Sequence, residues 1–344
     1  MTPCSCIGIN VTWTCNLHCR HCFYRRNDKL GQADHRPVEE ILTEAALGKM
    51  RGCDRVVLIG QGEPMMHPGI EEIIEGVAEL GMFSNVITNG TLSVSSYMKL
   101  FDVGLDHLQL SVHGLGHVLD EVSEMPHANA RQEALLSWLH KTGKPFRTNT
   151  TLQQLNYRGL PQIAEYMCVL GAFHVALLGF LPHYEWHEHV DEVAVHPALL
   201  RPYIEHAAAI LEEHGKLFTI RYHPFCHLSP RWWKYVVNAR YVLFDPWEWD
   251  YGYYHENPAF VWRHAQEIGE STAIQGAPCV ECVMRRHCGG WNRTYAAAFG
   301  GADLFPIKRV PFEYDHVCQR DGGLHDMNPA NAHCGHVGEG KEYA

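Results

Sequence analysis

Long apolar runs are missing from this sequence of 344 residues. No stretch approaches the roughly 18 consecutive apolar residues that a membrane span needs. The N-terminus also lacks the basic start and apolar run that mark a secretory signal. The sequence therefore predicts a cytoplasmic protein that is not bound to a membrane.

Clustered basic charge is missing as well. The chain has 28 Lys and Arg against 39 Asp and Glu, which gives a formal net charge of -11. A surface that binds nucleic acid needs grouped Lys and Arg, and the one short basic cluster, at residues 284–287, lies between cysteines. We therefore expect no nucleic-acid partner. Apolar residues make up 46% and charged residues 19% of the chain, which excludes a largely disordered protein.

Cysteines are abundant by contrast. There are 13 of them, and in a cytosolic chain they are expected to be metal ligands or buried thiols rather than disulfides. Six cysteines fall into two tight clusters: Cys15, Cys19 and Cys22, then Cys279, Cys282 and Cys288. The spacing within these clusters is more informative than the total number.

Strand-like and helix-like segments alternate through the first two thirds of the chain. Strands are expected at residues 7–13, 55–59, 84–87, 107–112, 146–152 and 173–178, and helices at 38–49, 70–80, 94–101, 131–141, 160–170 and 198–213. This alternation predicts a parallel α/β architecture, either a barrel or an open sheet. The alternation ends near residue 215, and aromatic residues are dense over 219–262. We expect two domains, 1–215 and 216–344, the aromatic stretch being a packed shell or a substrate-facing wall.

The first cysteine cluster follows directly on the first expected strand. A loop with the spacing of Cys15, Cys19 and Cys22 can wrap around a cubane, so that three irons each receive one thiolate and the fourth stays open. An open iron suits a cluster that activates a cofactor. The alternative is zinc, completed by His18 or His21.

Further polar residues stand at the ends of the next expected strands, where α/β enzymes assemble their sites. A glycine-rich turn at 60–64 exposes its backbone to a ligand, and the Glu63 carboxylate there can accept hydrogen bonds from an ammonium group. The alternative is an ordinary strand-to-helix turn. The candidate residues of these strand ends are Gln61, Gly62, Glu63, Pro64, Asn89, Ser111, Arg147 and Asn149.

The order of these features resembles the radical S-adenosylmethionine (radical SAM) superfamily. The resemblance implies a partial (β/α)6 barrel and a 4Fe-4S cluster on Cys15, Cys19 and Cys22. The open iron would bind the amino and carboxylate groups of SAM. An electron, from a flavodoxin- or ferredoxin-type donor, would then cleave SAM to methionine and a 5'-deoxyadenosyl radical, which removes hydrogen from a substrate.

The resemblance also implies roles for individual residues. Glu63 and the neighbouring backbone of 61–64 would hold the methionine amine, Tyr24 would lie near the adenine, and Ser111 would touch the ribose. Arg147 and Asn149 would contact the ribose or the carboxylate, and Asn89 closes its strand as in relatives. Two departures stand out, because Gln61 replaces a glycine and His113 stands where relatives carry Asp.

The second cysteine cluster resembles a SPASM or twitch extension, which binds auxiliary iron-sulfur clusters. Asn292 stands where the full SPASM pattern has a further cysteine, so one auxiliary 4Fe-4S cluster is expected on Cys279, Cys282 and Cys288. Cys318 is the first candidate for the fourth ligand, followed by Cys334 and Cys226. The alternative is a structural zinc site.

The sequence is least informative about the substrate. Only 14 residues precede Cys15, which leaves no room for an N-terminal peptide-recognition domain and favours a small sugar- or aminocyclitol-like substrate that is oxidised or epimerised. The alternative is a ribosomal peptide that is crosslinked or epimerised. Three roles are open for Cys226: a buried thiol, a cluster ligand or a hydrogen-atom donor. A non-catalytic iron-sulfur or zinc protein is the alternative from another class, but it would not need the residues at the strand ends.

Overall fold

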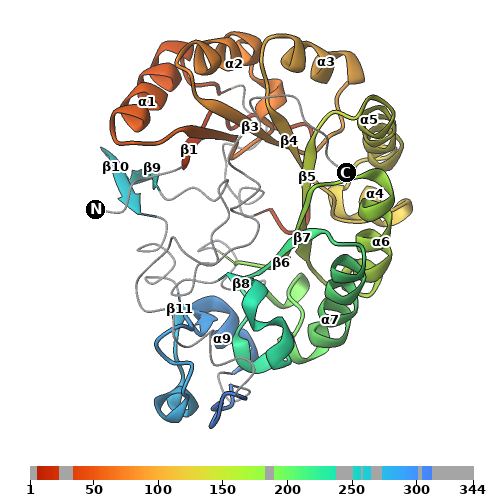
Figure 1. Cartoon of the computed structure of the whole chain (residues 1–344), viewed down its shortest axis with the longest axis vertical. Coiled ribbons are helices and arrows are strands. Elements are labelled where there is room, and N and C mark those ends of the chain that lie inside the picture. Colours follow the sequence, from red (N-terminus) through yellow and green to blue (C-terminus); the bar gives the residue numbers. More distant parts are fainter. Residues whose placement is uncertain are drawn as a thin grey trace.

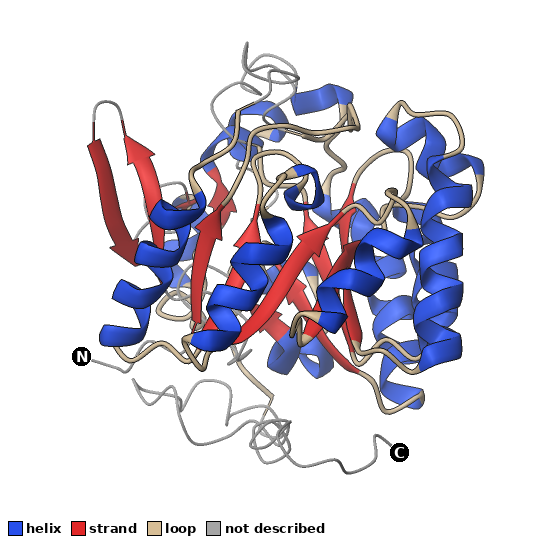
Figure 2. Ribbon diagram, turned by 90° about the horizontal axis from the view of Figure 1, so that it is seen from above, coloured by secondary structure: helices blue, strands red, loops and turns tan. Residues whose placement is uncertain are grey.

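A curved ten-stranded sheet forms the frame of the protein. The computed structural model describes residues 6–22, 34–182, 190–237, 251–256, 259–264, 273–300 and 304–311. The strands follow the order β10-β9-β1-β2-β3-β4-β5-β6-β7-β8. Figure 1 shows the crescent that they make, with strands on the inner side and helices on the outer side. The same two layers are visible from above in Figure 2.

Eight of the strands are parallel and follow one another across the sheet. They are β1 (Cys6–Asn10), β2 (Arg55–Ile59), β3 (Phe83–Thr88), β4 (His107–Ser111), β5 (Phe146–Leu152), β6 (His174–Gly179), β7 (Leu217–Arg221) and β8 (Val236–Val237). β9 (Tyr251–Glu256) pairs with the outer edge of β1, and β10 (Ala259–His264) runs antiparallel to β9. β11 (Ala273–Ile274) and β12 (Trp291–Asn292) form a separate small pair. Parallel order places the carboxyl ends of β1 to β6 along one rim.

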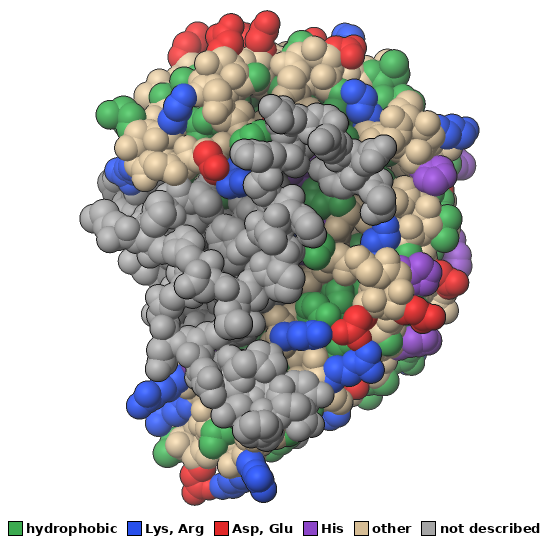
Figure 3. All heavy atoms as spheres, in the orientation of Figure 1, with side chains coloured by type: hydrophobic (Ala, Val, Ile, Leu, Met, Phe, Trp, Pro, Cys, Tyr) green, Lys and Arg blue, Asp and Glu red, His purple; other side chains and the backbone are tan. Residues whose placement is uncertain are grey.

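Helices connect the strands and cover the outer side of the crescent (Figure 1). They are α1 (Val38–Met50), α2 (Ile70–Glu79), α3 (Val94–Asp102), α4 (His117–Ser123), α5 (Ala128–Thr142), α6 (Leu160–Leu170) and α7 (Pro197–Glu213), with α9 (Arg293–Phe299) near the second cysteine cluster. Helix α4 was not expected from the sequence. In the view of Figure 3, charged side chains of both signs are interspersed along the outer rim.

The two faces of the sheet differ in chemistry, because successive side chains of a strand point to opposite sides. Ile7, Val56 and Leu108 belong to the apolar core between sheet and helices. On β4 and β5 the alternate positions include the buried polar side chains of Gln109, Arg147 and Asn149. Asn85 Nδ2 donates to Gln109 Oε1 at 3.1 Å across β3 and β4. The inner face is therefore polar, as a site for a polar ligand requires.

The predicted α/β partial barrel is confirmed, and β7 and β8 extend its sheet. The division into 1–215 and 216–344 stays a prediction, since these two strands lie beyond residue 215. Cys6 and Cys168 are buried and form no disulfide, whereas Cys53 is disulfide-bonded, against the expectation that the cysteines are reduced. Within the described ranges, no helix has the length and apolar character needed to traverse a bilayer.

Candidate active site at the carboxyl ends of the strands

Cys15, Cys19 and Cys22 lie on the loop that leaves β1. The backbone of this loop is anchored on helix α4, because His18 N donates to Ser123 O at 3.1 Å and Arg20 N donates to Val122 O at 2.8 Å. Cys22 N donates to Cys19 O at 3.0 Å and closes a turn between two of the cysteines. Helix α4 therefore supports the cysteine loop.

The chemistry of these thiols fits a cationic cluster. Burial, followed by the nearby Glu63 carboxylate, raises the pKa of the Cys15 thiol to about 12. Burial and the neighbouring thiols of Cys22 and Cys15 also raise the pKa of Cys19. Thiols of this kind become thiolates only when a metal supplies compensating charge. The three residues could hold the predicted 4Fe-4S cluster.

The Gly60–Pro64 turn packs directly on the cysteine loop. Gly62 N donates to Thr12 O at 3.0 Å, and Glu63 N donates to Thr14 O at 2.8 Å. A Cβ atom at Gly62 would lie 2.1 Å from Thr14 O. Glycine is therefore required for this close approach of two backbones. The turn is therefore fixed to the cysteine loop, and its contact with a ligand stays a prediction.

Glu63 ties this turn to the end of β3. Its carboxylate is 2% exposed, and Oε1 accepts from Thr88 Oγ1 at 2.6 Å while Oε2 accepts from Asn89 N at 2.7 Å. Burial raises the pKa of Glu63 to about 7. Both oxygens are bonded within the protein, so Glu63 positions the strand ends. Its contact with the SAM amine stays a prediction.

Side-chain amides connect the cysteine loop to the same strand end. Asn89 Nδ2 donates to Asn16 Oδ1 at 2.9 Å, and Asn16 Nδ2 donates to Thr91 Oγ1 at 2.8 Å. Thr91 Oγ1 in turn donates to Asn89 Oδ1 at 2.7 Å. Asn16 stands between two cluster residues in sequence, yet neither Asn16 nor Thr91 was expected to matter. The cysteine loop is thereby fixed relative to β3.

Gln132 of α5 holds the ends of β3 and β4 together. Its Nε2 donates to Asn89 O at 2.7 Å and to Ser111 O at 3.1 Å. Ser111 is paired with Asn149 in the register of β4 and β5. Asn89 directly follows β3, Ser111 ends β4, and Asn149 lies beside Ser111 on β5, so the structure brings these three predicted residues to adjacent strands.

Replacing Gln132 with alanine is expected to lower the free energy of unfolding by about 1–3 kcal/mol, because the carbonyl groups of Asn89 and Ser111, which are partly buried, lose their donor. Gln154→Ala is a matched control, since Gln154 Nε2 also donates to two backbone carbonyls, those of Asp191 and Ala194, but its side chain is exposed. Urea denaturation of the two variants checks this. Equal losses of unfolding free energy would show that the hydrogen bonds of buried Gln132 stabilise the protein no more than those of exposed Gln154.

Arg147 and Asn149 occupy different depths of the barrel. Arg147 is 2% exposed, pairs with Gln109 in the register and has Nη2 at 3.1 Å from His174 Nδ1. Asn149 lies two residues nearer the rim, and its buried Oδ1 has no hydrogen-bond partner among the described residues. The rim position leaves Asn149 better placed than Arg147 to meet a ligand. Tyr24 lies outside the described residues.

His113, at the position where the resemblance implies an aspartate, packs on His21 of the cysteine loop. The two rings meet edge to face at 4.3 Å. Gln153 Nε2 donates to His21 Nδ1 at 2.9 Å, and Thr151 N donates to His113 Nδ1 at 3.2 Å. Burial lowers the pKa of His21 to about 4 and lowers that of His113 as well. Both rings are neutral near pH 7, so His113 contributes packing where an aspartate would contribute charge.

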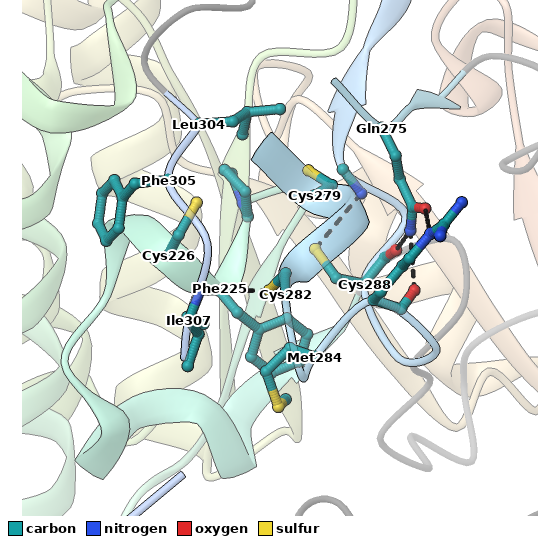
Figure 4. A pocket seen from close by; sticks show the side chains of 13 residues that line it. Phe225, Cys226, Gln275, Cys279, Cys282, Met284, Cys288, Leu304, Phe305 and Ile307 are labelled. Atoms are coloured by element: carbon teal, nitrogen blue, oxygen red, sulfur yellow. Dashed lines mark hydrogen bonds between the residues drawn. The ribbon is translucent and has the colours of Figure 1, made fainter. Parts of the chain in front are cut away.

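The second cysteine cluster lies apart from this rim. Cys279 is on the short helix η8 (Ala277–Glu281), and Cys282 and Cys288 follow it. A pocket lined by these three residues is also lined by Cys226 (Figure 4). Cys318 and Cys334 lie outside the described residues. Burial raises the pKa of the Cys288 thiol to about 11.

A buried histidine beside this region makes stability depend on pH. Burial, with His227 next, lowers the pKa of His223 from 6.5 to about 3. The unfolded chain therefore binds a proton that the folded chain does not, and stability falls as the pH drops from about 6.5 towards 3. Between pH 7 and pH 5, we expect the parent to lose about 2 kcal/mol more than His223→Gln. Chemical denaturation at both pH values checks this, and parallel losses would contradict it.

Comparisons with known proteins decide the family. Residues 9–167 match the model of the radical SAM superfamily. The chain contains a radical SAM domain. The prediction of a radical SAM domain is thus confirmed, and proteins with this domain use a 4Fe-4S cluster and SAM. The roles of individual site residues and the C-terminal auxiliary cluster stay predictions.

Curated relatives of this radical SAM domain include enzymes that modify peptides. The PqqA peptide cyclase of Methylorubrum extorquens (strain PA1) is 29% identical over 192 residues, which cover 54% of this chain and 48% of the relative. The tungsten-containing aldehyde ferredoxin oxidoreductase cofactor-modifying protein of Pyrococcus furiosus is 28% identical over 188 residues, 51% of each chain. The chain spans about half the length of these relatives.

Solved structures share the fold. Streptococcus suis SuiB bound to S-adenosylmethionine has a TM-score of 0.61 at 17% identity, over 91% of this chain and 77% of SuiB. The protein anSMEcpe with bound AdoMet and Cp18Cys peptide has a TM-score of 0.56 at 14% identity, over 91% of this chain and 95% of that one. At these identities the likeness confirms the α/β partial barrel alone.

Proposed function

We propose that this chain binds a 4Fe-4S cluster through Cys15, Cys19 and Cys22 and uses it to modify a peptide. The bound cluster and SAM supply a 5'-deoxyadenosyl radical after one-electron reductive cleavage of SAM. The observation that carries the cluster-binding part of the proposal is the attachment of the cysteine loop to the ends of β2 and β3. It brings three thiols to the same rim as Asn89, Ser111 and Asn149.

The protein's own part is binding and positioning. Ser111 and Asn149 supply polar groups on the adjacent strands β4 and β5 for the ribose and the carboxylate of SAM. Glu63 holds the end of β3, and Gln132 bonds the backbone carbonyls of Asn89 and Ser111. Donors and acceptors that are already fixed lower the entropy that the reacting groups must lose on reaching the reactive geometry. A protein accelerates a reaction in this way when the chemistry itself comes from a cofactor.

The peptide is preferred over the small sugar-like substrate that the sequence suggested. That expectation rested on the short segment before Cys15, whereas several of the curated relatives are PqqA peptide cyclases. Both substrate classes would use the same cluster and strand ends, so the geometry of the rim does not separate them. A flavodoxin- or ferredoxin-type protein remains our proposed electron donor.

Mass spectrometry can test the substrate class. The full chain, reconstituted anaerobically with iron and sulfide, is incubated with SAM, dithionite and a synthetic peptide encoded beside its gene. We expect 5'-deoxyadenosine together with one of two peptide products. Crosslinking removes two hydrogen atoms from the peptide, whereas epimerisation leaves its mass unchanged in ordinary water and adds one deuterium in heavy water. The same peptide in scrambled order is the control.

The opposite pattern would overturn the peptide proposal. If sugars or aminocyclitols are converted while the peptide is unchanged, the small-substrate alternative holds instead. The radical SAM chemistry itself would then stand, because both outcomes consume SAM.

A further inference from the structure

We propose that Cys226 is the fourth ligand of an auxiliary 4Fe-4S cluster whose other ligands are Cys279, Cys282 and Cys288. This inference deepens the proposed function and assigns the ligand that the sequence left open between Cys318, Cys334 and Cys226. It rests on the pocket of Figure 4, which all four thiols line.

The four thiols come from two distant segments of the chain. Cys226 is the central residue of the helical turn η6 (Phe225–His227), a few residues beyond β7. The other three lie on η8 and the loop that follows it. All four residues line one pocket, so their side chains border a common space.

The pocket has the polar contacts that a cluster of thiolates needs. Gly290 N donates to Cys288 Sγ at 3.3 Å, and Ile307 N donates to Cys282 Sγ at 3.4 Å. Gly290 has φ +85°, and a Cβ there would lie 2.0 Å from Ile274 O. Hydrogen bonds to the sulfur ligands stabilise the reduced cluster and set its potential. The glycine is thus required to aim one of these donors.

The remaining walls are apolar. Phe225, Met284, Leu304, Phe305 and Ile307 enclose the sulfur atoms. Within the described part of the chain, no three Cys, His, Asp or Glu side chains are gathered closely enough for a single metal ion. A cluster with four cysteine ligands has no open iron for a substrate, which leaves it the gain or loss of one electron.

Cys226 is placed by its surroundings rather than by its own thiol. Trp233 Nε1 donates to Phe225 O at 3.0 Å and to Leu228 O at 3.1 Å, on either side of Cys226. The His227 ring packs against Trp291 at 5.8 Å. The segment should keep its conformation when the thiol is changed to a hydroxyl. Cys226→Ser is therefore a fair test of ligation.

Ligation also bears on the hydrogen-donor role considered for Cys226. A thiolate bound to iron has no S–H hydrogen to give to a substrate radical. The two roles exclude each other while the cluster is bound. The inference predicts that Cys226 acts through the cluster.

The test uses the full chain carrying Cys15→Ala, Cys19→Ala and Cys22→Ala, so that only the auxiliary cluster can form. This background separates the inference from the proposed function, because no SAM cleavage is needed. After anaerobic reconstitution we expect about four irons per chain and the EPR signal of a reduced 4Fe-4S cluster. Adding Cys226→Ser should shift the reduction potential and the EPR signal, and adding Cys226→Ala should lower the iron content.

Cys318→Ser in the same background is the matched control and should leave the iron content, potential and signal unchanged. The inference is overturned if Cys226→Ser leaves potential and signal unchanged while Cys318→Ser alters them. It is also overturned if the background binds stoichiometric zinc and no iron. Circular dichroism shows whether each variant is folded. If Cys226→Ala unfolds, the reduction potential and EPR signal of Cys226→Ser decide whether Cys226 is a ligand.

Discussion

Replacing Cys15, Cys19 or Cys22 with alanine is expected to remove about four irons per chain and to stop formation of 5'-deoxyadenosine. Two remaining thiols cannot hold a cluster with one open iron. The α4 contacts of this loop use backbone atoms, so each variant should still fold. Iron analysis and chromatography of the SAM reaction check both expectations.

Cys168→Ala controls for the loss of a thiol as such. Cys168 is a buried cysteine of α6 that forms no disulfide and lies outside both cysteine clusters. This variant should keep the iron content and the activity of the parent. If Cys15→Ala behaves like Cys168→Ala, the first cluster is not where we place it.

Replacing Gly62 with alanine is expected to lower the free energy of unfolding by about 3 kcal/mol or more, at the upper end of overpacking effects. The added Cβ would lie 2.1 Å from Thr14 O, and neither backbone can move without breaking the hydrogen bonds between the two loops. Displacement of the cysteine loop should also impair loading of the first cluster. Urea denaturation and iron analysis measure the two effects.

Gly159→Ala is the matched control for this substitution. A Cβ at Gly159 meets no atom within 4 Å, and its φ of -84° is open to alanine. We expect a loss below about 1 kcal/mol, since alanine is only a poorer residue than glycine at a helix N-cap. A loss for Gly62→Ala as small as this would contradict the close packing of the two loops.

The three cysteines of the first cluster and the order of the strand ends could be predicted from local sequence. Thiol spacing, the Gly60–Pro64 turn and the alternation of strands and helices are each encoded within a few neighbouring residues. Parallel strands then bring their carboxyl ends to one rim whatever the details of packing. Asn89, Ser111 and Asn149 could therefore be placed together before any coordinates were known.

The supporting contacts could not be predicted in the same way. Gln132 is one polar residue on a helix, and only the packing of α5 against β3 and β4 shows that it is buried between two carbonyls. Asn16 reads as a spacer between cysteines until Asn89 is seen beside it. The grouping of Cys226 with a distant cysteine cluster depends on tertiary structure. The His113 departure became interpretable only when His21 was found against it.

The central claim is that the rim of the barrel generates a radical from SAM, and formation of 5'-deoxyadenosine tests it most directly. The parent chain is reconstituted anaerobically with iron and sulfide and mixed with SAM and dithionite. We predict 5'-deoxyadenosine and methionine in equal amounts, at a rate well above that of Cys15→Ala. A parent that loads iron yet forms no more 5'-deoxyadenosine than Cys15→Ala would contradict the account and favour a non-catalytic iron-sulfur protein.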